Sequence, residues 1–271
     1  MLAVAGYGTA WWRLRRRGAR WPPVRLASVL AGSVCAMAAV SPPVAGHDEL
    51  FPVHVAQHLL LAMAAPLLLA LSAPITLALR TLPARPRRVL LRVLHTSLAA
   101  AMSRPVTILV LYIGGLYGFY LTGMYAATER SALLHAAVHL HMFLAGCLLS
   151  WLLIGADPIR RRPGTGGRLA VLLVAAASHD TLAKLMYAWN LPVGAGPVAA
   201  RHLGSELMYY GGTVIDVALA VIIMAQWYAA TGRPLARQRP AAPDAPVIAS
   251  RPASTPQPSW GKQPIRQSPS R

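Results

Sequence analysis

Long apolar stretches separated by short basic segments dominate the pattern of this 271-residue chain. Six of these stretches approach or exceed the roughly 20 residues that a helix needs to cross a hydrocarbon core about 30 Å thick. They cover residues 26–46, 53–79, 105–124, 132–155, 168–187 and 206–230. The pattern predicts an all-α fold, a polytopic transmembrane helical bundle with six full spans.

A further apolar segment opens the chain and is only half as long. Residues 1–12, MLAVAGYGTAWW, run directly into the arginines that begin at Arg13. A signal peptide has the opposite order, with its positive charges before its apolar region. We interpret the segment as a short or truncated first span, with a short interfacial anchor as the alternative.

Composition and charge placement agree with a membrane protein. The chain is 55% hydrophobic and 13% charged, which is too apolar for an ordinary soluble domain of this length. Its net charge is +18. Of its 26 Lys and Arg residues, 23 lie in four segments: 13–25, 80–104, 156–168 and the segment after 230. By the positive-inside rule these segments are cytoplasmic. We therefore expect a multi-pass protein of the bacterial plasma membrane with a cytoplasmic C-terminus, in contact with the lipid bilayer and not with nucleic acid.

The composition changes after residue 230. Residues 231–271 contain nine prolines, together with many Ala, Arg, Gln and Ser residues. Such a segment buries too little apolar area to offset its ordering entropy. The sequence predicts two parts, a transmembrane helical domain over 1–230 and a disordered Pro/Arg-rich cytoplasmic tail over 231–271.

Histidines gather at the end of the spans opposite the arginines. Eight of the nine follow this rule, and His95 is the exception. The eight are His47, His54, His58, His135, His139, His141, His179 and His202. Because imidazole is a good ligand for copper, iron and zinc, a one-sided cluster of this kind indicates a transition-metal or haem site.

Two outer helix starts carry the same spacing, HVAQHLLL at 54–61 and HAAVHLHM at 135–142. Residues four apart share one helix face, so each pair can offer two imidazoles to one metal. Met142 continues the stripe of the second pair, and a thioether favours reduced copper. The alternative is that histidines near a membrane interface only bind headgroups, water or helix ends.

The segment SHDTLAKLMYAW at 178–189 places His179, Asp180 and Lys184 in an apolar helix. Ionisable groups within a span are costly unless they are paired or face a polar cavity. Asp180 and Lys184 are spaced to form an ion pair, and Asp216 lies deep in the last span. Asp-x-x-x-Lys also occurs in the retinal helix of microbial rhodopsins, but that scheme leaves the histidines without a role.

Cys35 and Cys147 lie within spans, so we expect small buried side chains and no disulfide.

Several motifs in order give the chain a recognisable family. It resembles the polytopic CtaG-type cytochrome c oxidase assembly factors in WWRLRRRG, in the first His-x-x-x-His pair followed by LLLAMAAPLLLALSAP, in the second pair, in GADP at 155–158, and in SHDTLAKLMY. The likeness covers residues 1–230. The short first span departs from the seven full spans of that family.

The resemblance implies a part in assembling haem-copper oxidase at the step that supplies copper, with oxidase subunits as partners. The histidine positions of that family match five residues here: His54, His58, His135, His139 and His179. The helical spacing adds Met142 to these candidate metal ligands. No paired catalytic carboxylates, serine–base arrangement or nucleotide loop is evident in the sequence, so we do not expect an enzyme. A membrane b-type haem protein and a copper or small-solute transporter are the alternatives.

The charge asymmetry yields a test of topology. A reporter that works only in the cytoplasm should be active when it is fused within 80–104 or after Arg162. A reporter that works only in the periplasm should be active when it is fused within 190–204. Fusion activities measured in whole cells check each loop. A periplasmic reporter that is active after Arg162 would reverse the assignment.

Overall fold

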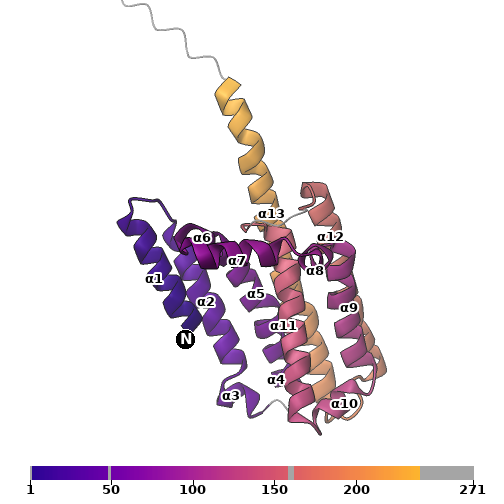
Figure 1. The fold of residues 1–271 in the computed structure, drawn as a ribbon. Helices are drawn as coiled ribbons and strands as arrows, with labels where there is room; N and C mark the ends of the chain where they lie inside the picture. The colour runs from indigo at the N-terminus through magenta and orange to yellow at the C-terminus, as the bar shows by residue number, and fades with distance from the viewer. Residues whose placement is uncertain (1, 48–49, 158–161, 239–271) are drawn as a thin grey trace, which may run out of the picture. The chain divides into compact units, whose positions relative to one another are not determined.

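The structure is a computed structural model that describes residues 2–47, 50–157 and 162–238, and in these ranges it contains helices and no strand. Its helices are α1 (Leu2–Arg16), α2 (Pro23–Ala39), α3 (Pro42–Ala45), α4 (Phe51–His58), α5 (Ala65–Ser72), α6 (Pro74–Thr81), α7 (Ala84–Leu94), α8 (Ser97–Met102), α9 (Pro105–Leu121), α10 (Met124–Thr128), α11 (Ala132–Ile154), α12 (Thr165–Trp189) and α13 (Val198–Gln238). Figure 1 shows the long helices side by side, with α6, α7 and α8 at one end and α3 and α10 at the other. The all-α prediction is confirmed.

Length and composition support fewer complete spans than we expected. In the part of the chain that the structure describes, four helical stretches are long and apolar enough to cross a membrane: Phe51–Thr81, Ala132–Ile154, Thr165–Trp189 and Val198–Gly232. The helices at the other two positions, α2 and α9, are apolar but only 17 residues long. The count of six full spans plus a short first one stays a prediction.

The stretch Phe51–Thr81 is not one regular helix. A π-helical segment, Leu59–Ala64, follows α4 directly, and the chain breaks again at Ala73, which has a left-handed backbone with φ of 52°. Pro66 lies in the first turn of α5 and Pro74 begins α6. Since proline has no N–H to donate, each irregularity falls where a helical hydrogen bond is missing. The two prolines thus account for the irregular course of this stretch.

The break at Ala73 is closed by a residue from elsewhere in the chain. The buried Asp157 carboxylate accepts hydrogen bonds from the backbone N–H groups of Ile75 (3.2 Å) and Thr76 (2.6 Å), and from the Thr76 hydroxyl (2.7 Å). It thus satisfies the free donors at the start of α6, where a negative charge is also favoured by the helix dipole. This contact gives the GADP motif a structural purpose, although its Pro158 lies outside the described residues.

Two arginines cap the C-terminus of a helix. At the C-terminus of α11, Arg162 donates to the carbonyl of Ile154 (2.7 Å) and Arg168 to that of Leu153 (2.9 Å). Both guanidinium groups also donate to the Gln226 side-chain oxygen on α13. Cations and donors at the last turn of a helix satisfy its free carbonyls and complement its dipole. The contacts tie α11, α12 and α13 together at the arginine-rich end.

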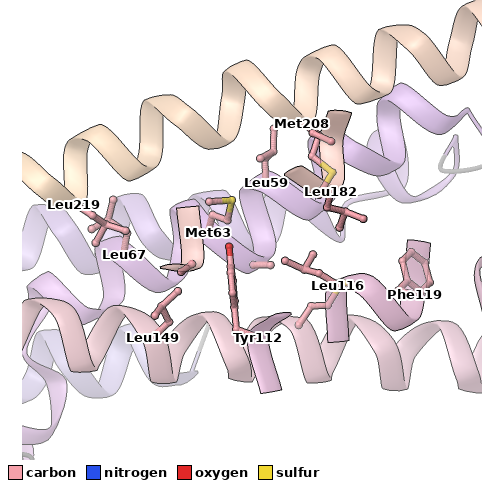
Figure 2. Close-up of a cluster of buried hydrophobic side chains, with 14 of the residues drawn as sticks. Leu59, Met63, Leu67, Tyr112, Leu116, Phe119, Leu149, Leu182, Met208 and Leu219 are labelled. Carbon is pink, nitrogen blue, oxygen red and sulfur yellow. The ribbon is translucent and has the colours of Figure 1, made fainter. Parts of the chain in front are cut away.

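The core lies between the long helices and is almost entirely apolar. Figure 2 shows Leu59, Met63 and Leu67 facing Tyr112, Leu116 and Leu149, with Leu182, Met208 and Leu219 beside them. A second cluster joins α1 to the bundle, where the buried Tyr7 hydroxyl donates to the Ser72 carbonyl at 2.7 Å. Cys147 is buried, Cys35 is half-buried, and both are free thiols.

The chain divides into two units, Met1–Ala230 and Thr231–Arg271. Helix α13 continues to Gln238, beyond residue 230, where we expected the last span to end. Residues 239–271 lie outside the described residues, so the disordered tail stays a prediction.

Replacing Asp157 by Ala should lower stability by about 1–3 kcal/mol, because three donors at the start of α6 lose their acceptor. The apparent melting temperature of the purified protein in detergent checks this. Asp157→Asn retains one acceptor oxygen and should lose less. Equal melting temperatures for wild type and Asp157→Ala would contradict the assigned cap.

Candidate functional site

Helix α4 presents two buried imidazoles, one turn apart. His54 and His58 are 1% and 2% exposed, and the π-helical segment begins at the next residue. A π-segment widens the helix and is frequent next to functional sites. The two rings lie at the end of the bundle opposite α6, α7 and α8 (Figure 1), directly before the interruption of regular helical hydrogen bonding.

Helix α11 brings a second pair to the first. The rings of His135 and His139 are 4.3 Å apart between centroids and nearly perpendicular. The His54 ring lies 6.2 Å from that of His135 and 5.5 Å from that of His139. These three residues form what we call the outer group. His135 and His139 are only partly buried and line a cavity of about 630 Å³.

Helix α12 supplies a partner for His58. The rings of His58 and His179 are nearly parallel, with centroids 6.2 Å apart, and we call these two residues the inner pair. The His179 ring is fully buried and lies against Gly212 of α13, where any Cβ atom would collide with it. Glycine at this position therefore allows α13 to approach the ring closely. The structure brings all five predicted histidines together, but in these two groups.

The nitrogens of the three buried rings have no hydrogen-bond partner. Both Nδ1 and Nε2 of His54, His58 and His179 are inaccessible and unpaired. Leaving one buried polar group unsatisfied costs about 1–3 kcal/mol, and histidines that only support a fold are normally hydrogen-bonded. This pattern is typical of side chains that await a ligand.

The rings do not form a finished metal centre as they stand. Among the residues that the structure describes, no group of three or more His, Cys, Asp or Glu side chains could hold a metal ion. Two imidazoles bound to one ion at about 2 Å have centroids roughly 5–6.5 Å apart, and three ring pairs of this site fall in that range. These are His54–His135, His54–His139 and His58–His179. Ring rotation would be needed to aim the nitrogens at a common point.

Met142 lies with the inner pair and not with the outer group. It is buried and shares a cavity of about 10 Å³ with His58, Tyr112 and His141. The His141 ring is exposed, with Nε2 at 3.2 Å from the Leu111 carbonyl oxygen of α9. Met142 therefore points toward α4, as its place on the His135 and His139 stripe indicates. Its neighbour on α4 is His58, one turn after His54.

The remaining histidines have other surroundings. His202 lies 3.0 Å from the Asn190 side-chain oxygen and stacks on Tyr187 with centroids 4.0 Å apart, which ties α13 to the end of α12. His95 is exposed at the arginine-rich end, where its Nδ1 lies 2.6 Å from the Leu91 carbonyl oxygen. His47 is exposed beyond α3.

Aromatic side chains around His54 were not anticipated from the sequence. Phe119 stacks on the His54 ring with centroids 5.4 Å apart. The ring centroids of Tyr125 and Phe51 lie 5.3 and 6.5 Å from that of His54. Tyr120 lies edge-on to both His54 and His58. The sequence signal was the run of aromatics at the outer end of α9, at the depth of the histidines. These rings shield His54 from lipid and fix its position.

Gln57 is a second residue that sequence analysis missed. Its side-chain nitrogen donates to the Ala39 carbonyl at 2.8 Å, which holds α4 to the end of α2, and it also lines the 630 Å³ cavity. Its oxygen is buried without a partner. A polar acceptor thus stands beside the outer group.

Two carboxyl groups lie near the His179 ring. Asp180 follows His179 on α12, and Asp216 lies one turn after Gly212 on α13. One oxygen of each is buried without a hydrogen-bond partner. The Lys184 ammonium, which we considered as a partner for Asp180, lies over the Tyr209 ring at 5.0 Å from its centroid. Two further ionisable groups thus lie beside the inner pair in an apolar bundle.

Comparison with known proteins gives the site a family context. The chain is 31% identical to an uncharacterized protein of Mycobacterium leprae over 82% of its own length, and 30% identical to uncharacterized proteins of Mycobacterium bovis and Mycobacterium tuberculosis over 84%. It spans 37% of the length of each of these relatives. No solved structure matches it. The family model of the cytochrome c oxidase caa3 assembly factor (Caa3_CtaG) matches residues 5–230, and the chain belongs to this family.

Proposed function

We propose that this protein assists the assembly of a haem-copper oxidase by holding copper at the outer group and the inner pair and passing it to an oxidase subunit. The observation that carries the proposal is the set of six buried ring nitrogens without partners on His54, His58 and His179. Neutral imidazoles, with the thioether of Met142 beside His58, suit reduced copper. The role is that of a metallochaperone and not of an enzyme.

The two groups differ in access, which supports a direction of transfer. His135 and His139 line the large cavity, so copper or a partner could reach the outer group there. The inner pair is enclosed by the bundle, with Gly212 against one ring. We infer that copper is exchanged at the outer group and is held at the inner pair. With the arginine-rich end in the cytoplasm, the outer group faces the outside of the bacterial plasma membrane.

The alternatives gain less support. A haem needs several hundred cubic ångströms beside its axial ligands. The enclosed inner pair offers only about 10 Å³ at His58, and a space of the required size, about 630 Å³, is found only beside the partly exposed outer group. A transporter needs polar side chains that continue to the other face, and below the two carboxylates the core consists of residues such as Leu152, Leu219 and Ile223. An absorption spectrum of the purified protein separates haem from copper.

The double substitution His135→Ala and His139→Ala should lower the copper retained by the purified protein roughly tenfold or more, since two of three outer ligands are lost. Metal analysis checks retention, and oxidase activity in copper-limited medium should fall at unchanged protein level. Added copper should partly restore a single substitution by mass action. His95→Ala is the control and should change neither quantity. A double variant that matures the oxidase as well as wild type under copper limitation would overturn the mechanism.

Gly212→Ala tests the inner pair without removing a ligand. The added Cβ collides with the His179 ring and should displace it, so copper retention should fall several-fold while the histidines remain. Alanine favours helix, so a general loss of α13 is not expected. Gly114→Ala, where a Cβ atom meets open space, is the matched control. Full retention in Gly212→Ala would show that the position of this ring does not matter.

A further inference from the structure

Helix α7 is poorly covered by the rest of the protein. It lies across the ends of the long helices, and none of its residues is buried (Figure 1). Val89 and Val93 are more than half exposed, as is Leu98 on α8. Exposed valine and leucine in a row on one helix need an apolar cover.

Most polar and apolar residues of α7 occupy different faces, and Arg87 is the exception, because it lies on the side of Leu91 and Leu94. Arg85, Arg88 and Arg92 follow one another at helical spacing. Val89, Leu90 and Val93 form the other stripe, with Pro86 one turn before them. A basic amphipathic helix of this kind lies in the interface of a membrane, with its apolar face toward the acyl chains.

A cavity of about 230 Å³ opens beneath α7 and α8. Its walls are apolar and come from five helices, including Leu94, Met102, Ile108, Leu148 and Trp151. Asp157 also lines it, but the Asp157 oxygens accept hydrogen bonds from the start of α6. The cavity therefore offers apolar surface, with guanidinium groups on the adjacent helix.

We propose that α7, α8 and this cavity bind one anionic phospholipid. The guanidinium groups of Arg85, Arg88 and Arg92 contact the phosphate of the headgroup, and part of one acyl chain fills the cavity beside Trp151. Charge complementarity selects an anionic headgroup, because three exposed cations lie on one face. The apolar cavity next to them selects a lipid over a free phosphate. This site lies at the end of the bundle opposite the histidines and does not depend on their function.

Native mass spectrometry of the full-length protein in detergent, titrated with phosphatidylglycerol or phosphatidylcholine, tests the proposal. Wild type should hold the first phosphatidylglycerol more tightly than phosphatidylcholine. Arg85→Gln, Arg88→Gln and Arg92→Gln together should weaken phosphatidylglycerol binding roughly tenfold to a hundredfold and leave phosphatidylcholine unchanged. The many other basic residues at that end preserve the orientation of insertion.

A matched triple variant distinguishes binding at a specific site from general attraction by the basic residues at that end of the protein. Arg15→Gln, Arg16→Gln and Arg17→Gln remove the same charge from the end of α1 and should weaken binding much less. Ala99→Phe, which fills the cavity, should also weaken phosphatidylglycerol binding, whereas Ala100→Phe, outside the cavity, should not. Equal losses in the two arginine variants, or no preference of wild type for phosphatidylglycerol, would overturn the proposal.

Discussion

The structure depends on one constraint: a polar group inside a membrane bundle has no water to bind, so the protein itself must satisfy it. Most buried polar groups here obey this. The Asp157 carboxylate accepts hydrogen bonds from the free donors at the start of α6, Arg162 and Arg168 donate to the last carbonyls of α11, and the Tyr7 hydroxyl donates to the Ser72 carbonyl. Single buried atoms such as the Gln57 side-chain oxygen depart from this rule, and the six unpaired ring nitrogens of His54, His58 and His179 form the largest group of departures, which marks the site.

The same constraint explains why the irregular backbone lies where it does. The π-helical segment after His58 and the break at Ala73 both lie in the Phe51–Thr81 stretch, packed between α2 and α11. Irregular backbone is tolerated at membrane depth where protein surrounds it. Close packing by glycine assists this: Gly146 of α11 has no room for a Cβ atom beside the Ala62 carbonyl. The backbone of α11 thus packs directly against the backbone of the π-helical segment.

Sequence patterns were sufficient for the helical class and the neighbourhood of the five histidines. Periodicity places His54 and His58 on one face, and the alternation of basic and apolar segments places both at one end. It could not show that the histidines divide into an outer group and an inner pair, because that depends on how α11 and α12 are positioned around α4. For the same reason it could not show that Met142 shares a cavity with His58. Gln57, Phe119 and Gly212 were missed because their roles arise only from packing between helices.

The division into two groups has a physical consequence for a metal in transit. A fully enclosed pair of histidines can bind tightly but cannot exchange its metal rapidly with a partner protein, since no partner reaches it. A partly exposed group can exchange but competes with water. His54 and His58 lie one turn apart on α4, so a short movement along this helix would link the two environments. Under the proposed function, the aromatic rings of Phe119 and Tyr120 would keep that path free of lipid, and Asp180 and Asp216 would offset the positive charge of the ion in the apolar bundle.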